Sequence, residues 1–138
     1  MNIYHVDCWC SHNPGKGGWR VLLNEKQIHR EDHDFHSNNF YELSAIHTAC
    51  QIANESLEPS IIFSDSRIAL GWVRKNPSFG VLNRSELMDI IENIRIILSN
   101  NKLISLKFWS TRQRGENPAD FGRKPKRKKW RSMVCRRG

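Results

Sequence analysis

Four acidic residues stand where an acid is unusual or where a metal ion could use it: Asp7, Glu42, Asp65 and Asp120. Asp7 interrupts the apolar, β-prone stretch 2–9, although aspartate is depleted in strands. Asp65 directly follows the apolar run 61–63, at the carboxyl end of a predicted buried strand, where α/β sheets place their sites. Glu42 falls early in the first predicted helix, and Asp120 falls in the last one.

Carboxylates gathered at one place repel one another, and burying them without partners costs several kcal/mol. A divalent cation offsets this repulsion, and hard oxygen ligands with retained waters suit Mg²⁺ or Mn²⁺. Two such ions, roughly 3.5–4 Å apart, can activate a water and stabilise the leaving oxygen in phosphodiester hydrolysis. Composition and spacing alone go no further than a candidate metal-dependent nuclease.

Three of the four acids also have a purely structural explanation. Asp65 could be only a helix N-cap, Glu42 only a first-turn acid favoured by the helix dipole, and Asp120 only a surface residue. Asp7 is the hardest to explain in this way.

The hydrophobic periodicity predicts an α/β fold around these acids. We expect strands over 2–9, 19–23, 27–36, 61–63 and 103–109, and helices over 40–55, 84–98 and 116–123, with turn-rich segments at 12–18 and 76–83. A further helix, capped within 64–66, carries an apolar stripe of Ile68, Ala69, Trp72 and Val73. The third strand is polar on both faces, as expected of a sheet edge. Three strands in hairpin order, followed by strand–helix–strand crossovers, predict a mixed sheet flanked by helices.

The charge distribution divides the chain into two parts. Of its 22 Lys and Arg residues, nine lie between positions 122 and 138, which contain no acid, so the remainder carries 13 basic against 14 acidic residues. A near-neutral body with a basic tail is typical of a protein that holds a polyanion, although such a tail can also serve only solubility or targeting. We therefore expect a catalytic domain over 1–123 and a basic C-terminal tail over 124–138.

Other features indicate a cytoplasmic protein. No apolar run approaches the roughly 18 residues of a membrane span, and the N-terminus lacks a signal-peptide pattern. The four cysteines do not suggest a disulfide framework, so we expect reduced thiols. We also expect a monomer.

Four segments of the chain resemble the ribonuclease H family, type 1. Tyr4-His5-Val6-Asp7 and the segment 10–19 resemble the family's first strand and its Cys-x-x-Asn-Pro-Gly-x-Gly-Gly turn. The segment 37–43 resembles its Asn-Asn-x-x-Glu-Leu helix start, 61–66 its strand ending in the third acid, and Asn117-Pro118-Ala119-Asp120 its closing Asn-x-x-Ala-Asp. Each motif alone is weak, but together and in order they are specific.

The resemblance implies a five-stranded mixed sheet in the order 3-2-1-4-5 and endonucleolytic cleavage of the RNA strand of RNA–DNA hybrids, leaving 5′-phosphate ends. It implies that Asp7, Glu42, Asp65 and Asp120 hold two Mg²⁺ ions, with Mn²⁺ as a substitute. It also implies that the minor groove of the hybrid, where 2′-hydroxyls identify the RNA strand, is lined by the backbone around Cys10 and Asn13 and by Asn38, Asn39 and Arg67. Asn38 and Asn39 could equally be plain helix caps.

The chain departs from the family pattern at three places. Cys8 and Trp9 stand where small residues usually follow the first aspartate, and the segment 110–116 lacks the usual histidine. The loop 76–83 is too short for the basic protrusion that some members use to hold the hybrid. We hypothesise that the tail replaces this protrusion, with phosphate contacts from Lys126, Arg127, Lys128 and Lys129.

Two other functions fit the same fold. One is a module that binds nucleic acid without cutting it, and the other is a nuclease that acts on DNA. The four acids argue against the first, and the Asn-Asn-x-x-Glu-Leu and Cys-x-x-Asn-Pro-Gly matches argue against the second.

Overall fold

The structure, a computed structural model, describes residues 1–75 and 84–120. The predicted loop 76–83, the domain boundary at 123 and the basic tail all lie outside the described residues. The same is true of the four predicted phosphate contacts in that tail.

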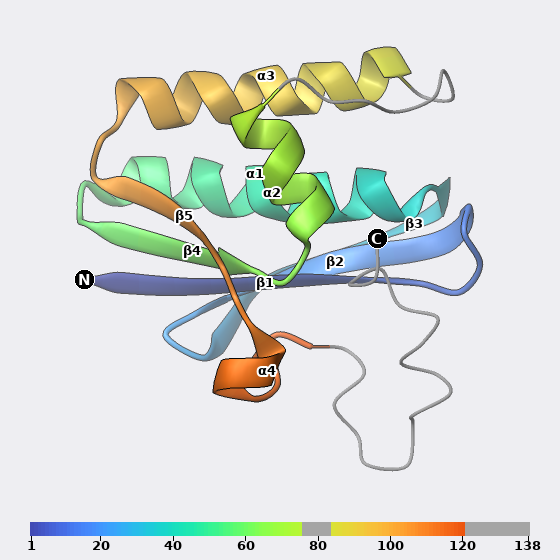
Figure 1. The fold of residues 1–138 in the computed structure, drawn as a ribbon, viewed down its shortest axis with the longest axis horizontal. Helices are drawn as coiled ribbons and strands as arrows, with labels where there is room; N and C mark the ends of the chain where they lie inside the picture. Colours follow the sequence, from blue (N-terminus) through green and yellow to red (C-terminus); the bar gives the residue numbers. More distant parts are fainter. Residues whose placement is uncertain (76–83, 121–138) are drawn as a thin grey trace.

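A five-stranded mixed sheet forms the centre of the molecule (Figure 1). Its strands are β1 (Asn2–Cys10), β2 (Gly15–Leu23), β3 (Lys26–His36), β4 (Ser60–Ser64) and β5 (Ile104–Phe108). The order β3-β2-β1-β4-β5 confirms the predicted sheet. β1 pairs with β2, and β2 with β3, in antiparallel fashion, whereas β4 runs parallel to both β1 and β5.

Three helices cover one face of the sheet: α1 (Asn38–Ser56), α2 (Arg67–Arg74) and α3 (Arg84–Asn100). In Figure 1, α1 lies on the sheet and α3 lies beyond it, while the short α4 (Thr111–Arg114) lies on the opposite side. The apolar stripes of α1 and α3 pack together through buried residues such as Leu43, Ile46, Ile91 and Ile94. Within the described ranges, no helix has the length and apolar character needed to cross a bilayer.

One predicted strand boundary and one predicted helix are wrong. β2 begins at Gly15 rather than Trp19, because the glycine-rich segment pairs with β1 instead of forming a loop. A Cβ atom on Gly17 would overlap the Tyr41 ring and the Trp9 carbonyl, so this close approach requires glycine. The predicted helix at 116–123 is not formed over its described part, where residues 117–120 make a turn. The helix of this region is α4, which Ser110 caps.

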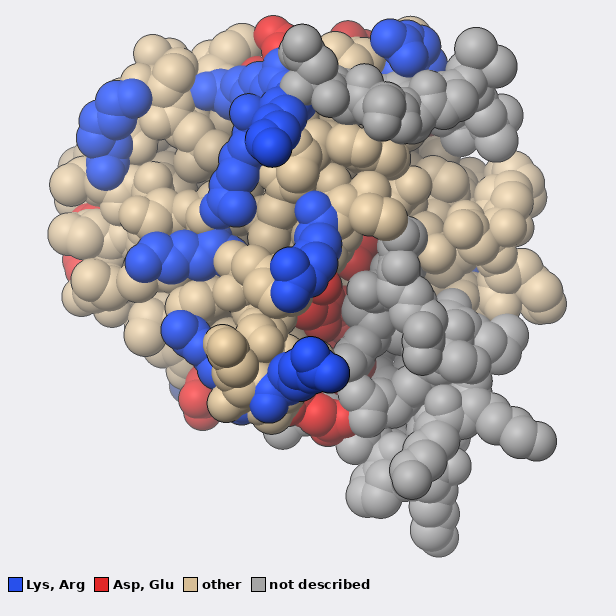
Figure 2. Space-filling model, in the orientation of Figure 1, with Lys and Arg blue, Asp and Glu red and all other residues tan. Residues whose placement is uncertain are grey.

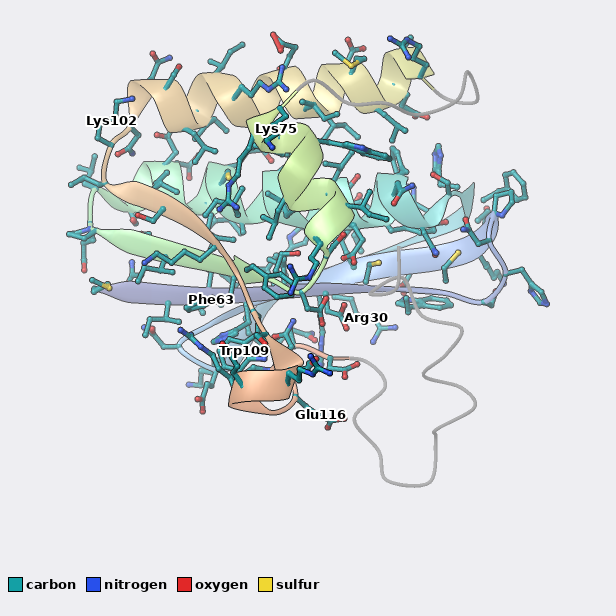
Figure 3. All side chains as sticks on the ribbon, viewed as in Figure 1. Arg30, Phe63, Lys75, Lys102, Trp109 and Glu116 are labelled. Carbon is teal, nitrogen blue, oxygen red and sulfur yellow. The ribbon has the colours of Figure 1, made fainter. Side chains whose placement is uncertain are left out.

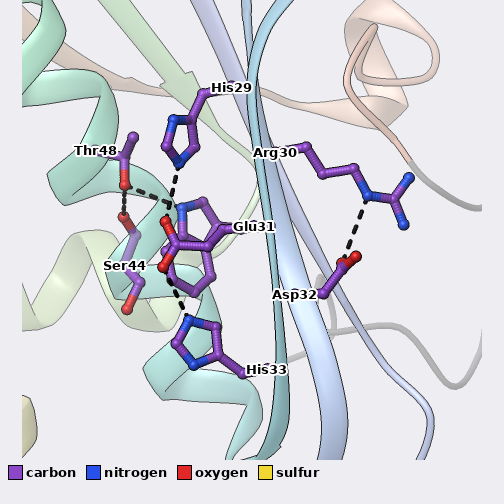
Figure 4. A network of polar contacts seen from close by, with 8 residues as sticks. His29, Arg30, Glu31, Asp32, His33, Ser44 and Thr48 are labelled. Atoms are coloured by element: carbon purple, nitrogen blue, oxygen red, sulfur yellow. Dashed lines mark hydrogen bonds and ion pairs between the residues drawn. The ribbon is translucent and has the colours of Figure 1, made fainter.

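β3 is the polar edge strand that its sequence predicts, and its two faces carry separate ion pairs (Figure 4). Towards α1, both Glu31 carboxylate oxygens lie 3.0 Å from an imidazole Nε2, one of His29 and one of His33. Arg30 and Asp32 form a pair on the other face. Charges on both faces of an edge strand discourage pairing with another sheet.

The thiols are not all in the expected state. Cys10 and Cys50 are free and buried, as expected. Cys8 is disulfide-bonded, which corrects the expectation of reduced thiols at this position.

Candidate active site

Three of the four predicted acids meet where β1, β4 and the start of α1 converge. Asp7, Glu42 and Asp65 each contribute a carboxylate oxygen, and these three oxygens all lie within 4.8 Å of one another. Asp7 and Glu42 are fully buried, and Asp65 is half-buried. Figure 2 shows acidic surface recessed between Lys and Arg side chains on one face of the molecule. Hard oxygen donors in this arrangement are a ligand set for a divalent cation.

Two serines fix the backbone on either side of Asp65. The Ser64 hydroxyl accepts a hydrogen bond from the Ser66 backbone N–H at 3.1 Å. The Ser66 hydroxyl in turn accepts from the Ala69 N–H at 3.1 Å, so Ser66 is the N-cap of α2. Asp65 is therefore not the helix cap, and its carboxylate turns to the acid cluster instead.

Glu42 reaches the cluster from one turn inside α1. Ser37 is the N-cap of this helix, and no acid stands in its first turn. The dipole explanation for Glu42 is therefore wrong. The neighbouring Tyr41 hydroxyl donates to the Gly15 carbonyl at 2.7 Å, which ties α1 to the start of β2. Burial raises the pKa of this tyrosine to about 12, so it remains a donor.

Asp120 lies in a turn that is tied to the sheet beside Asp7. Its carboxylate is not part of the three-oxygen cluster, although the residue is only 1% exposed and is therefore not a surface residue. The buried Asn117 amide donates to the Val6 carbonyl at 2.9 Å and accepts from the Ala119 N–H at 3.1 Å. The turn closes with a hydrogen bond of 2.9 Å from the Asp120 N–H to the Asn117 carbonyl.

Arg20 makes a second tie to this turn, and the sequence did not single it out. It is the β2 residue paired with Asp7, and its Nε donates to the Ala119 carbonyl at 2.9 Å. A hydrogen bond between residues 99 positions apart leaves no signal in local sequence, where an arginine in a strand resembles an ordinary outward-facing side chain.

Four of the residues predicted to line the minor groove of the hybrid, Cys10, Asn13, Asn38 and Asn39, lie where the β1–β2 loop contacts the start of α1. The Asn13 side-chain oxygen accepts from the Asn38 N–H at 3.0 Å. The Cys10 thiol donates to the His12 carbonyl at 2.8 Å, and burial raises the pKa of this thiol, so it stays protonated. The side-chain oxygens of Asn38 and Asn39 are buried and accept no hydrogen bond from the described residues. Neither asparagine is the cap, which is Ser37.

Two arginines lie on aromatic rings at the β5 side of the site. The Arg67 guanidinium lies 4.2 Å from the centre of the Phe108 ring. Arg114, in α4, lies 5.1 Å from the Phe63 ring and 5.3 Å from the Trp109 ring, two aromatics labelled in Figure 3 near α4. α4 thus occupies the segment in which the family pattern has a histidine, and its arginine is held by cation–π contacts.

A pocket of about 480 Å³ lies on the α4 side of the sheet, lined by residues that include His5, Phe63, Trp109 and Arg114. His5 is 4% exposed and stacks on Phe63 at 5.4 Å. Burial lowers its pKa, with a smaller raising effect from Glu25 and a lowering one from Arg114. Neither ring nitrogen has a hydrogen-bond partner among the described residues, and together with the lowered pKa this favours the neutral imidazole.

Trp9, the departure next to Cys8, does not enter the acid cluster. Its indole N–H donates to the Asp32 carboxylate at 3.3 Å, across the sheet on β3. Together with Lys16 and His33 it lines a small surface pocket there.

The sequence is similar to known ribonucleases H. The family model described as RNase H matches residues 1–102. The Ribonuclease H of Chlorobium phaeobacteroides (strain DSM 266) is 30% identical over 130 residues, which cover 84% of this chain and 85% of the relative. The Ribonuclease H of Prosthecochloris aestuarii is 37% identical over 86 residues, but the match covers only 56% of this chain and 58% of that relative.

The fold is similar to solved structures at lower identity. An N-terminal RNase H domain from Mycobacterium tuberculosis, solved as a fusion with maltose-binding protein, has a TM-score of 0.66 at 14% identity and covers 83% of this chain and 89% of its own. LC11-RNase H1, solved in complex with an RNA/DNA hybrid, has a TM-score of 0.60 at 15% identity. The match covers 97% of this chain and 94% of the LC11-RNase H1 chain. At such identities the structures show the shared fold.

Proposed function

This chain belongs to the ribonuclease H family, and on that premise we propose that it hydrolyses the RNA strand of RNA–DNA hybrids with divalent metal ions. The observation that carries the proposal is the convergence of the Asp7, Glu42 and Asp65 oxygens within 4.8 Å, two of them on fully buried residues. The relatives named Ribonuclease H support the activity, and the hybrid-bound LC11-RNase H1 supports the substrate.

The donor set fits Mg²⁺. All three ligands would be hard carboxylate oxygens, the donor type that Mg²⁺ prefers, and they lie within 4.8 Å of one another. Asp7, Glu42 and Asp65 would hold the metal, and Asp120, in the turn tied to β1, would complete the site. When bound, Mg²⁺ or Mn²⁺ would supply an activated water and stabilise the leaving oxygen.

The protein's own contribution is to orient these carboxylates before the metal arrives. The serine pair fixes Asp65, the buried first turns of α1 fix Glu42, and strand pairing fixes Asp7. Preorganised charges of this kind stabilise a transition state without the cost of reorganisation during the reaction. The products would be 5′-phosphate and 3′-hydroxyl ends.

Strand selection would depend on the joint between the β1–β2 loop and α1. The side-chain oxygens of Asn38 and Asn39 would accept hydrogen bonds from 2′-hydroxyls, and backbone N–H groups near Cys10 and Asn13 would donate to them. Arg67, whose guanidinium is oriented by Phe108, would contact the hybrid backbone from α2.

The test is cleavage of three end-labelled duplexes of the same sequence: an RNA–DNA hybrid, duplex DNA and duplex RNA. In Mg²⁺ we expect cutting of the hybrid only, in its RNA strand only, with 5′-phosphates identified on the products. Asn39→Ala should narrow the difference in cleavage rate between the hybrid and duplex DNA, because it removes a proposed contact to a 2′-hydroxyl, which DNA lacks.

Other outcomes would favour the two remaining functions. Cutting of duplex DNA at a similar rate would identify a DNA nuclease. Tight hybrid binding without cutting in Mg²⁺ or in Mn²⁺ would make the chain a binding module and would overturn the proposal.

A further inference from the structure

Two ties hold the turn of Asp120 against the sheet, one at the β1 residue before Asp7 and one at the β2 residue paired with Asp7. The Asn117 amide reaches the Val6 carbonyl on β1, immediately before Asp7. Arg20 reaches the same turn from β2, where it is the cross-strand partner of Asp7. Within the turn, the Asp120 N–H donates to the Asn117 carbonyl and the Ala119 N–H donates to the Asn117 side chain, and the two ties connect this unit to β1 and β2.

The planar Arg20 guanidinium can donate several hydrogen bonds at once, which suits it to holding the turn of Asp120. Its Nε donates to the Ala119 carbonyl at 2.9 Å, and one terminal nitrogen makes a longer contact of 3.5 Å to the Asp120 carbonyl. Its other terminal nitrogen contacts the Gln27 side chain on β3 at 3.4 Å. A planar group held at three points cannot be replaced by a lysine, whose ammonium is a single point charge on a flexible stem.

The position of Arg20 also matters electrostatically. Residues directly opposite on paired strands have Cβ atoms roughly 5 Å apart, so the side chains of Arg20 and Asp7 leave neighbouring points on the same face of the sheet. The Arg20 guanidinium contacts the carbonyl groups of Ala119 and Asp120, and its positive charge would offset part of the repulsion that Asp120 meets on approaching a cluster of three carboxylates.

We infer that Arg20 is a positioning residue, which holds the turn of residues 117–120 so that Asp120 stands beside Asp7. The inference rests on the proposed function for its catalytic consequence, but the positioning itself is independent of any activity. No motif of the sequence assigns a role to this arginine.

The test compares Arg20→Lys and Arg20→Met with Arg30→Met in the full chain. Arg30 is the matched control because it is the β3 partner of Arg20 in the sheet register but is exposed and pairs with Asp32 at the surface. The first readout is amide hydrogen exchange, measured by NMR without metal or substrate. We expect faster exchange at Ala119 and Asp120 in both Arg20 variants, with the β1 and β4 amides unchanged, and no change at either turn amide in Arg30→Met.

The second readout is a double-mutant cycle on hybrid cleavage with Asp120→Asn. Arg20→Met should lower kcat by roughly tenfold to a hundredfold, as expected for a small misplacement of a reacting group, while KM stays within about twofold. If Arg20 acts through Asp120, the same substitution should have almost no further effect in the Asp120→Asn background.

Unchanged exchange at Ala119 and Asp120 would overturn the inference, and so would full additivity in the cycle. A wild-type protein that cuts nothing would instead refute the proposed function, and the exchange data would still decide the role of Arg20.

Discussion

Asp7, Glu42 and Asp65 are brought together from β1, α1 and the end of β4, and their closeness has a cost in the absence of metal. Two unit charges about 5 Å apart repel by roughly 3 kcal/mol at an effective dielectric constant of about 20. The three oxygens lie within 4.8 Å of one another, so each carboxylate meets two such neighbours when all are ionised. The site therefore favours function over the stability of the metal-free protein.

This conflict predicts opposite effects of Asp7→Asn on stability and on activity. The substitution removes one charge without changing size, so the metal-free protein should gain about 2 kcal/mol of unfolding free energy. Urea denaturation in EDTA measures the gain, and Mg²⁺ should stabilise the wild type but not the variant. The exposed Asp89→Asn on α3 is the control and should change neither quantity. A loss of stability in Asp7→Asn would show that repulsion within the acid cluster does not destabilise the metal-free protein.

The buried His5 should make the stability of the folded protein sensitive to acid. Because burial lowers its pKa below the ordinary value of 6.5, the unfolded chain binds a proton at this position more readily than the folded protein does. Its effect on stability is absent above about pH 6.5, and stability should fall as the pH drops below this value. His5→Phe, which keeps the stacking on Phe63, should flatten the dependence of Tm on pH between about pH 5 and 7. It will not abolish that dependence, since burial also lowers the pKa of His47. An unchanged slope would show that His5 titrates normally.

At the scale of elements, the approach of α1 to the start of β2 depends on Gly17. A side chain there would overlap the Tyr41 ring and the Trp9 carbonyl. We therefore expect Gly17→Ala to cost about 3 kcal/mol of unfolding free energy. A Cβ atom on Gly71 in α2 would have no neighbouring atom within 4 Å, so Gly71→Ala should stabilise the protein by up to about 1 kcal/mol. Urea midpoints of the two variants test the contrast, and equal effects would contradict it.

The sequence correctly predicted the strands whose local hydrophobic pattern matches their place in the sheet. The apolar run before Asp65 and the polar edge strand were both placed correctly, and the sheet order implied by the family resemblance is confirmed. Whether Asp65 or Ser66 caps α2 could not be read from residue types, since both are good caps, and only the backbone at Ser66 decides it.

Contacts between segments that are distant in the chain could not be predicted from local sequence patterns. The helix predicted at 116–123 is not formed over its described part, because the Asn117 side chain binds the Val6 carbonyl on β1 and holds a turn instead. The β1–β2 loop was predicted too long because glycines favour turns, whereas here they allow close strand and helix packing. Arg20 was missed for the same reason, because its partners lie about a hundred residues away.

Across the whole chain, the excess positive charge is concentrated in the last 17 residues. Residues 1–121 carry 13 basic and 14 acidic residues, whereas the remaining 17 residues carry nine basic residues and no acid. Binding to a polyanion depends on salt in proportion to the number of phosphates neutralised.

We therefore expect the tail to supply much of the affinity for the hybrid, through Lys126, Arg127, Lys128 and Lys129. A chain ending at residue 123 should show a higher KM and a weaker dependence of KM on salt, with kcat spared. Replacing the same four residues by Gln in the full chain is the matched control for chain length and should give a similar result. An unchanged salt slope in both proteins would exclude the tail as the phosphate contact.

The most direct test of the metal site is cleavage of an RNA–DNA hybrid, labelled on each strand, by the wild type, Asp65→Asn and Asp89→Asn. The reaction is started by adding Mg²⁺ after EDTA treatment, and hybrid binding is measured in parallel. We predict that the wild type and Asp89→Asn cut the RNA strand only after Mg²⁺ is added, and that Asp65→Asn binds the hybrid but cuts at least about a thousandfold more slowly. Cleavage by Asp65→Asn at the wild-type rate, or cleavage that needs no metal, would contradict the assignment of Asp7, Glu42 and Asp65 as the metal site.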